Sequence, residues 1–434
     1  MARKAKKLQE LQTMFDENDI DFSKIKDIIV IKDLIERVEK IPDFRDESYV
    51  KHKLSDIVLL TLFAVLSNAN EWSEIEAFGI KKENWLRNYL ELEHGIPSDD
   101  TIRIVISNID SRYFYEIVIE FFIEIVANLS RLANATTTLA NATTTEEPDI
   151  ISIDGKTSCG SKRNDTDIMG TKALHTLNAY SNDYGMCIGQ VFVDEKSNEI
   201  PAAKDLLKII DIKDTVVTWD ALNTQKTTVK AVIKNKGDYV GALKGNQGNL
   251  YDDVKDYFDD EELQKIKKKK ENYIVTKEKE HSAIVTREYF LTTNIRWLSA
   301  KKDWKGLKSI GVEKKVIEKK NGQIINEDRY FICSIESVET FAKAVRGHWG
   351  VENSLHWHLD FTFKDDKNTT MRNNGAKNLQ IIKKISLSIL RTVQTFYKVS
   401  LKMIRYRLSL DFDNEISTIF KLLNVEDLKR ALYK

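Results

Sequence analysis

Two hydrophobic patterns divide the chain. Up to about residue 128, apolar positions recur with helical spacing, as in LSDIVLLTLFAVLSNA and SRYFYEIVIEFFIEIVANL. From Asp149 onward, short β-branched runs such as ISIDGK, ALHTLNAYSN and MCIGQVFVDE predict three successive strands. A helix at IPAAKDLLKII, a strand ending at Asp220, a helix at TQKTTVKAVIKNK and a strand at DYVGALK follow. The pattern predicts an all-helical N-terminal domain followed by an α/β core of order β-β-β-α-β-α-β.

A different alternation interrupts this core between about residues 248 and 337. The stretches IVTKEKEHSAIVTREYFLTT and LKSIGVEKKVIEKKNGQIINEDRYFICSI have strand period. Lys320-Asn321-Gly322 supplies the Asn-Gly pair that favours a two-residue hairpin turn. We therefore expect an antiparallel β insertion, followed by a final helix that starts near Val338.

Two predicted strands each end in an aspartate. Asp154 lies in DIISIDGKTSCGS and Asp220 in DTVVTWDALNTQ, both after β-branched runs. An aspartate at a strand end is, taken alone, more often a turn or helix-cap residue. Two such carboxylates with a third from a later helix can hold two hard divalent cations such as Mg²⁺ or Mn²⁺. A pair of ions about 3.5–4 Å apart supports phosphoryl chemistry.

The segment VRGHWGVENSLHWHLDFTFKD concentrates unusual chemistry. It holds three of the seven histidines and two of the seven tryptophans, with Glu352 in the middle. If the segment is helical, His348, Glu352 and His356 share one face. This predicts a face that touches metal, nucleic acid or both. A single Zn²⁺ or Fe²⁺ on these three side chains is an alternative, but they span about 12 Å along the axis, too far for one ion without distortion.

These stretches resemble DDE-type insertion-sequence transposases, of the H-repeat-associated branch (the ISAs group). The matching motifs, in order from Ile41 to Arg391, include IDGKTSCGS, TWDALNTQ, YVGALKGNQGNL, REYFLTTNIRWL, RGHWGVENSLHWHLDFTF and NNGAKNLQIIKKISLSIL. The resemblance implies that Asp154, Asp220 and Glu352 are the catalytic triad of an RNase H-like core, in which the first and fourth strands, which carry the two aspartates, are neighbours. It also implies Mg²⁺ as the cofactor, with Mn²⁺ as a substitute.

The resemblance implies a DNA transposase. Such an enzyme cleaves insertion-sequence ends and joins the freed 3′-hydroxyl to target DNA by two-metal-ion phosphoryl transfer. Its partners would be double-stranded DNA, as terminal inverted repeats and target, and a second copy of the chain when two ends are synapsed. The alternative is a degenerate transposase-derived protein that binds DNA without cleaving it.

Several residues near the triad are candidates for DNA-binding or supporting roles. Arg346 could neutralise phosphate charge, and the two histidines could orient the scissile phosphate or a water. Local hydrogen bonding is the alternative for each, and core packing is the alternative for the tryptophan. The candidates are Lys244, Asn246, Arg346, His348, Trp349, Asn353 and His356.

The domain boundaries follow from these patterns. A perfect duplication of LANATTT from Leu132 to Thr145 marks the boundary between helical domain and core. We expect a helical N-terminal domain (1–128), a linker (129–147), the first part of the core (148–247), a β-rich insertion (248–337), the second part with the catalytic helix (338–395) and a basic helical C-terminal tail (396–434).

Charge and composition restrict the remaining possibilities. Lys+Arg and Asp+Glu both number 67 in 434 residues, which argues against a globally basic nucleic-acid binder. Met371–Lys434 holds 13 Lys/Arg against 5 Asp/Glu, a local excess of +8 that favours DNA contact there.

Three cysteines without paired spacing fit a reducing compartment. No N-terminal signal region is evident, and the longest apolar run, Ile57–Leu66, is too short to span a bilayer. We expect a prokaryotic cytoplasmic protein, with no membrane partner, that is nucleoid-associated when bound to DNA.

Overall fold

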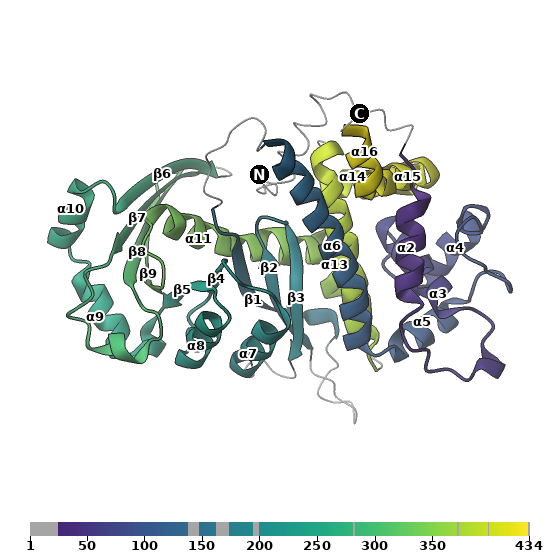
Figure 1. The fold of residues 1–434 in the computed structure, drawn as a ribbon, viewed down its shortest axis with the longest axis horizontal. Helices are drawn as coiled ribbons and strands as arrows, with labels where there is room; N and C mark the ends of the chain where they lie inside the picture. Colours follow the sequence, from purple (N-terminus) through teal and green to yellow (C-terminus); the bar gives the residue numbers. More distant parts are fainter. Residues whose placement is uncertain are drawn as a thin grey trace.

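The chain forms a mixed α/β structure in which a twisted sheet is joined at one end to a helical bundle (Figure 1). The computed structural model describes residues 25–137, 147–161, 173–193, 199–280, 283–370, 373–397 and 399–432. The strands are β1 (Ile150–Ser158), β2 (Leu174–Ser181), β3 (Met186–Val193), β4 (Val216–Trp219), β5 (Asp238–Leu243), β6 (Tyr273–Glu280), β7 (Ala283–Thr292), β8 (Ser309–Lys319) and β9 (Ile324–Cys333).

Helices cover both faces of the sheet and build the bundle. They are α2 (Ile28–Val38), α3 (Leu54–Leu66), α4 (Trp72–Leu86), α5 (Asp99–Asn108), α6 (Ser111–Thr137), α7 (Glu199–Ile209), α8 (Lys226–Lys234), α9 (Asn249–Tyr257), α10 (Asp260–Lys268), α11 (Val338–Gly350), α12 (Trp357–Phe361), α13 (Gly375–Tyr397), α14 (Leu401–Leu410), α15 (Phe412–Leu423) and α16 (Val425–Leu432).

The nine strands form one sheet of order β3-β2-β1-β4-β5-β9-β8-β7-β6. β1 pairs with β4, and β4 with β5, in parallel, whereas β2, β3 and β9 run antiparallel to their neighbours. Parallel neighbours need a crossover connection. Helices α7 and α8 belong to these crossovers and pack together against one face of the sheet. The predicted β-β-β-α-β-α-β order is confirmed.

Alternation along β1 separates the two faces of the sheet. Ile151 and Ile153 join the core beneath α7 and α8, whereas Ile150 joins the core beneath α11. Ser152 points the same way as Ile150, since its hydroxyl donates to the carbonyl of Gly347 in α11 at 3.1 Å. The period of two along a strand therefore places the even-numbered residues of β1 under α11.

The segment from 248 to 337 extends the sheet. Its four strands pair antiparallel in sequence order, and Gly322 at the β8–β9 hairpin has a φ of +80°. β9 pairs with β5, so these strands continue the sheet outward (Figure 1). Helices α9 and α10, at the start of the segment, were not anticipated from its strand-like alternation.

The C-terminal helices α14–α16 share a hydrophobic core with α2–α6 and α13. The segment from 396 onward therefore packs into the bundle rather than extending as a tail. Part of its positive charge is buried: the guanidinium of Arg405 donates to the carbonyl of Val65 at 2.7 Å. Other buried cations of the basic C-terminal region are Lys383, Lys384 and Arg391. The local excess of +8 overstates the positive surface available to DNA.

Helix α6 passes the boundary predicted at residue 128 and ends at Thr137, inside the first LANATTT copy. The second copy, 139–145, lies outside the described residues. In the described part of the chain, no helix combines the length and the apolarity needed to cross a bilayer.

A buried ionic contact fixes the end of α12 to β1. The Lys156 ammonium donates to the carboxylates of Asp360 in α12 and, at 3.4 Å, Asp366 beyond it. The hydroxyl of Ser158 donates to Asp365 at 2.6 Å. These contacts restrict how far the α11–α12 segment can move relative to β1.

Gly311→Ala is expected to disturb the packing of α11 on the sheet and to lower the free energy of unfolding by about 1–3 kcal/mol. A Cβ at Gly311 would lie 2.5 Å from the ring of Phe341, which is buried against Tyr289 and Phe331. Urea unfolding measures the change. Gly245→Ala, with open space around the added methyl, is the matched control. Equal stability of the two variants would contradict the tight contact.

Candidate active site

Asp154 and Asp220 lie beside each other where the pairing of β1 with β4 stops. Asp220 follows the end of β4 as predicted, whereas Asp154 lies in the middle of β1, so the prediction that it ends its strand is wrong. Ile153 and Trp219 are paired in the parallel register of β1 and β4, and each aspartate is the next residue along its chain. Neighbouring strands are about 4.8 Å apart. Strand alternation turns both side chains toward the face covered by α11. The expectation that the two aspartates come from neighbouring strands is confirmed.

Glu352 lies in the π-helical turn η7 (Val351–His356), which continues α11 into α12. The turn packs against β1, and the Glu352 side chain is exposed. The shared face predicted for His348, Glu352 and His356 requires regular α-helical spacing, which this turn does not have. A π-turn inserts an extra residue and re-aims the side chains that follow; such turns are frequent at functional sites.

The carboxylates repel one another. Burial, followed by the negative charges of Glu352 and Asp220, raises the pKa of Asp154 from its ordinary value of 3.8 to about 7. Burial also raises the pKa of Glu352, although the positive charge of Arg329 opposes the rise. A bound cation would remove this repulsion by favouring the ionised carboxylates.

The donor chemistry of the site fits a hard divalent cation, because all three side chains offer carboxylate oxygens. Among the described residues, no three acidic, histidine or cysteine side chains converge closely enough to hold a metal ion as they lie. Glu352 is exposed and can change rotamer without repacking the core. The single-ion alternative on His348, Glu352 and His356 gains no support, since the two histidines turn to partners in the sheet.

His356 lies closest to Asp154, with Nδ1 3.5 Å from an Asp154 carboxylate oxygen. Burial, with help from the charges of Lys156 and Lys384, lowers the pKa of His356 to about 3, so the ring is neutral near pH 7. Asn178 Nδ2 lies 3.3 Å from His356 Nε2, and Asn178 Oδ1 accepts from Lys384 at 2.6 Å. An amide donor at Nε2 leaves the ring proton on Nδ1, facing Asp154.

His348 has a structural position on the side of α11 that faces the sheet. Its Nδ1 is 3.2 Å from the hydroxyl of Thr218, two residues before Asp220. Burial lowers the pKa of His348 to about 4, although the charge of Asp220 opposes the fall. The neutral ring joins α11 to β4.

Arg346 and Trp349 contact the strands of the outer sheet. The guanidinium of Arg346 donates to Glu278 at 2.8 Å and Glu280 at 2.7 Å, both in β6. Trp349 lies under two cations, with the Arg329 guanidinium 4.6 Å and the Lys315 ammonium 5.8 Å from the ring centroid. The positive charge of Arg346 is thus already paired within the chain.

The loop after β5 lies close to Asp220. Its short helix η5 (Gly245–Gln247) contains Asn246, whose side-chain amide donates to the carbonyl of Ala221 at 2.9 Å. Lys244 and, from η7, Asn353 are exposed. These two side chains are available to a ligand.

Some residues at the site were missed in the sequence. Arg329 acts on the pKa of Glu352 from β9, and strand period alone does not distinguish it from other surface arginines. Asn223 follows Asp220 by three residues, and its amide contacts Asp220 and the buried Glu199. Glu199 lies in the first turn of α7. Acidic residues are common there because they interact favourably with the helix dipole, so the sequence gives no sign of a further role.

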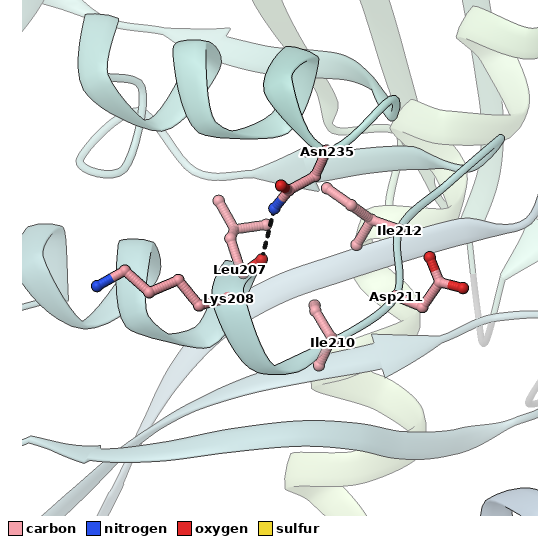
Figure 2. Close-up of a pocket in the computed structure, with 6 residues that line it drawn as sticks. All are labelled: Leu207, Lys208, Ile210, Asp211, Ile212 and Asn235. Carbon is pink, nitrogen blue, oxygen red and sulfur yellow. Dashed lines mark hydrogen bonds between the residues drawn. The ribbon is translucent and has the colours of Figure 1, made fainter.

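A hollow of about 340 Å³ lies elsewhere (Figure 2). It is lined by the ends of α7 and α8 and by the connection into β4: Leu207, Lys208, Ile210, Asp211, Ile212 and Asn235. Five of these residues precede β4 and Asn235 precedes the parallel strand β5, whereas Asp220 follows β4. The hollow and the two aspartates therefore lie at opposite edges of the sheet.

Comparison with known proteins places the chain in a family. Residues 35–122 match the family described as DDE_Tnp_1-associated, and residues 145–389 match the Transposase DDE domain. The chain is 36% identical over 370 residues to "Putative transposase YncI" of Escherichia coli O157:H7, covering 83% of this chain and 88% of the relative. It is 34% identical over 372 residues to "H repeat-associated putative transposase YhhI" of Escherichia coli K12, covering 84% and 92%.

Two further similarities are more limited. "Inactive transposase YbfQ" of Escherichia coli K12 is 47% identical over 77 residues, 18% of this chain and 92% of the relative. A cryo-EM structure of the piggyBac transposase synaptic complex with hairpin DNA aligns with 94% of this chain and 81% of that one, at 11% identity and a TM-score of 0.36, a likeness too weak to define the fold. The two family matches and the long alignments to E. coli relatives agree with each other. The chain belongs to the DDE-type transposases, in the H-repeat-associated branch.

Proposed function

We propose that the chain is a metal-dependent DNA transposase that cleaves insertion-sequence ends and joins the freed 3′-hydroxyl to target DNA. Asp154, Asp220 and Glu352 are the catalytic triad in this proposal. The observation that carries it is that Asp154 in β1 and Asp220 just after β4 lie side by side on the face covered by α11, with Glu352 in η7 near enough for its charge to raise the pKa of Asp154. The strand order β3-β2-β1-β4-β5 supports an RNase H-like core around them.

The three carboxylates hold the cofactor, Mg²⁺ or Mn²⁺, in their ionised form. When bound, the ions supply an activated water and neutralise charge on the leaving 3′-oxygen. The chain's own part is to offer three oxygen donors in a site where burial and the neighbouring negative charges raise the pKa of Asp154, so that a cation would be favoured there. No serine or tyrosine nucleophile is required, because the 3′-hydroxyl itself attacks the target.

Double-stranded DNA would approach along the exposed side of η7. Glu352 and Asn353 are exposed there, and Lys244 is exposed on the loop beside Asp220. Arg329 supplies positive charge close to Glu352. We propose that these cations contact the backbone around the scissile phosphate. A second copy would join when two element ends are synapsed.

Glu352→Gln is expected to reduce Mg²⁺-dependent cleavage of DNA carrying the flanking element's ends at least about 100-fold, because a neutral amide is a poor ligand for a hard cation. Asp154→Asn and Asp220→Asn should do the same. A gel-based nicking assay measures the rates, and Glu336→Gln, an exposed glutamate ahead of α11, is the matched control. Wild-type binding without cleavage would favour the degenerate DNA-binding protein. Equal cleavage by wild type and Glu352→Gln would exclude Glu352 from the site.

Asp154→Asn is expected to stabilise the metal-free protein at pH 8. The pKa of Asp154 is about 7 in the folded protein and 3.8 ordinarily, so the folded state retains a proton that the unfolded state releases. The free energy of unfolding of the wild type therefore falls as the pH rises from about 4 to 7. The Asp154→Asn variant lacks this fall because its amide does not titrate. The gain at pH 8 should be on the order of 1–3 kcal/mol.

Urea unfolding in EDTA at pH 5 and pH 8 measures this gain, with the exposed Asp211→Asn as the control. The difference between Asp154→Asn and wild type should be larger at pH 8 than at pH 5. A variant less stable than wild type at pH 8 would show that the Asp154 carboxylate is stabilised by its surroundings.

A further inference from the structure

A fourth carboxylate, that of Glu199, is buried against the proposed metal site. Glu199 opens α7 and is 3% exposed. It lies on the face of the sheet opposite α11, where the odd-numbered residues of β1 point. An ionised carboxylate in such a position is costly unless it is fully hydrogen-bonded. Its partners therefore indicate what it does.

Both oxygens of Glu199 are engaged. One is hydrogen-bonded to Nε2 of His175 at 2.8 Å, and the other accepts from the side-chain amide of Asn223 at 3.1 Å. The other ring nitrogen of His175 is hydrogen-bonded to the hydroxyl of Thr157 at 2.8 Å. His175 is itself 3% exposed, so β2 holds this end of the arrangement firmly.

The Asn223 amide connects Glu199 to Asp220. Its nitrogen donates one hydrogen to Glu199 and lies 3.3 Å from Oδ1 of Asp220. The backbone N–H of Asn223 donates to the same Asp220 oxygen at 3.1 Å. Oδ1 of Asp220 thus receives two donors from one residue, which fixes the plane of the carboxylate.

The direction of the Asn223 amide is set by these charges. Asn223 is 1% exposed, and its carbonyl oxygen has no hydrogen-bond partner in the described structure. A buried acceptor without a partner is destabilising. Flipping the amide would instead turn that oxygen toward two carboxylates and remove both donated bonds.

Gly155 makes room for the arrangement. A Cβ there would lie 2.6 Å from Oε1 of Glu199 and 2.9 Å from Nε2 of His175. Gly155 follows Asp154 directly, so the Glu199–His175 pair packs against the backbone next to the first aspartate. The requirement for glycine at 155 is steric, because no positive φ is found there.

We propose that Asn223, held in place by Glu199, is a positioning residue that orients Asp220 for the divalent cation. The inference rests on the proposed function for the identity of the metal site. Glu199 is not itself a ligand here, since both of its oxygens are occupied and its side chain faces away from α11. Outer partners of this kind orient the residues that bind a metal and typically change metal affinity 10–100-fold when removed.

Binding of Mn²⁺ to the full chain, followed by electron paramagnetic resonance, tests the proposal without requiring cleavage. Asn223→Leu keeps the side-chain shape but removes the amide donor, and should weaken Mn²⁺ binding about tenfold or more. Glu199→Gln retains an oxygen to accept from Asn223 and should stay within about threefold of wild type. Asp220→Asn marks the loss of the site itself.

Asn235→Leu is the matched control. The side-chain amide of Asn235 donates one structural hydrogen bond, to the carbonyl of Leu207 at 2.7 Å (Figure 2). Asn235 lies at the end of the sheet opposite to Asp220. It should bind Mn²⁺ as wild type does. If thermal melting shows that Asn223→Leu is unfolded, the comparison is made with Asn223→Ser and Asn235→Ser instead.

The outcomes separate the two proposals. If Mn²⁺ binding is weakened in the Asn223 variant but not in the Asn235 variant, the positioning role is supported. This holds even if wild type cuts no DNA and the proposed function fails. Wild-type affinity in the Asn223 variant, or an equal loss in the Asn223 and Asn235 variants, overturns the positioning role while leaving cleavage by wild type unaffected. A wild-type chain that binds no Mn²⁺ overturns both.

Discussion

The parallel pairing of β1 with β4 determines the geometry of the candidate site. The register Ile153–Trp219 brings Asp154, within β1, and Asp220, just after β4, side by side although they are 66 residues apart in sequence. Strand alternation then turns both toward α11, whose continuation η7 contributes Glu352. A slip of one residue in that register would turn one aspartate to the opposite face. The position of every other group at the site is defined relative to these two aspartates.

This geometry concentrates negative charge at the candidate site, and the surrounding residues offset part of that charge. Neutral His356 faces Asp154, Asn223 donates to Asp220, and Arg329 lies near Glu352. These contacts do not offset the burial and the neighbouring negative charges, which together raise the pKa of Asp154 to about 7. The protein therefore has a site that is strained without a cation and relieved by one. Local destabilisation of this kind is expected where selection acts on function rather than on stability.

Sequence patterns predicted the strands and crossovers well because buried parallel strands and amphipathic helices have strong periodicities. They also predicted that the strands of Asp154 and Asp220 are neighbours. They did not predict helices α9 and α10, whose segment was dominated by strand-like alternation. Contacts set by the tertiary fold were invisible in the sequence: Arg346 pairs with β6, and Glu199 reaches Asp220 through Asn223. The assignments of Asp154, Asp220 and Glu352 to a catalytic triad remain predictions.

The central claim is that three carboxylates from β1, the end of β4 and η7 bind divalent cations together. A crystal of the full chain soaked in Mn²⁺, with anomalous scattering recorded at the manganese edge, tests it directly. The account predicts a peak between Asp154 and Asp220, with the Glu352 side chain rotated into coordination distance. No peak at these residues, or a peak bound by His348 and His356 instead, would contradict it.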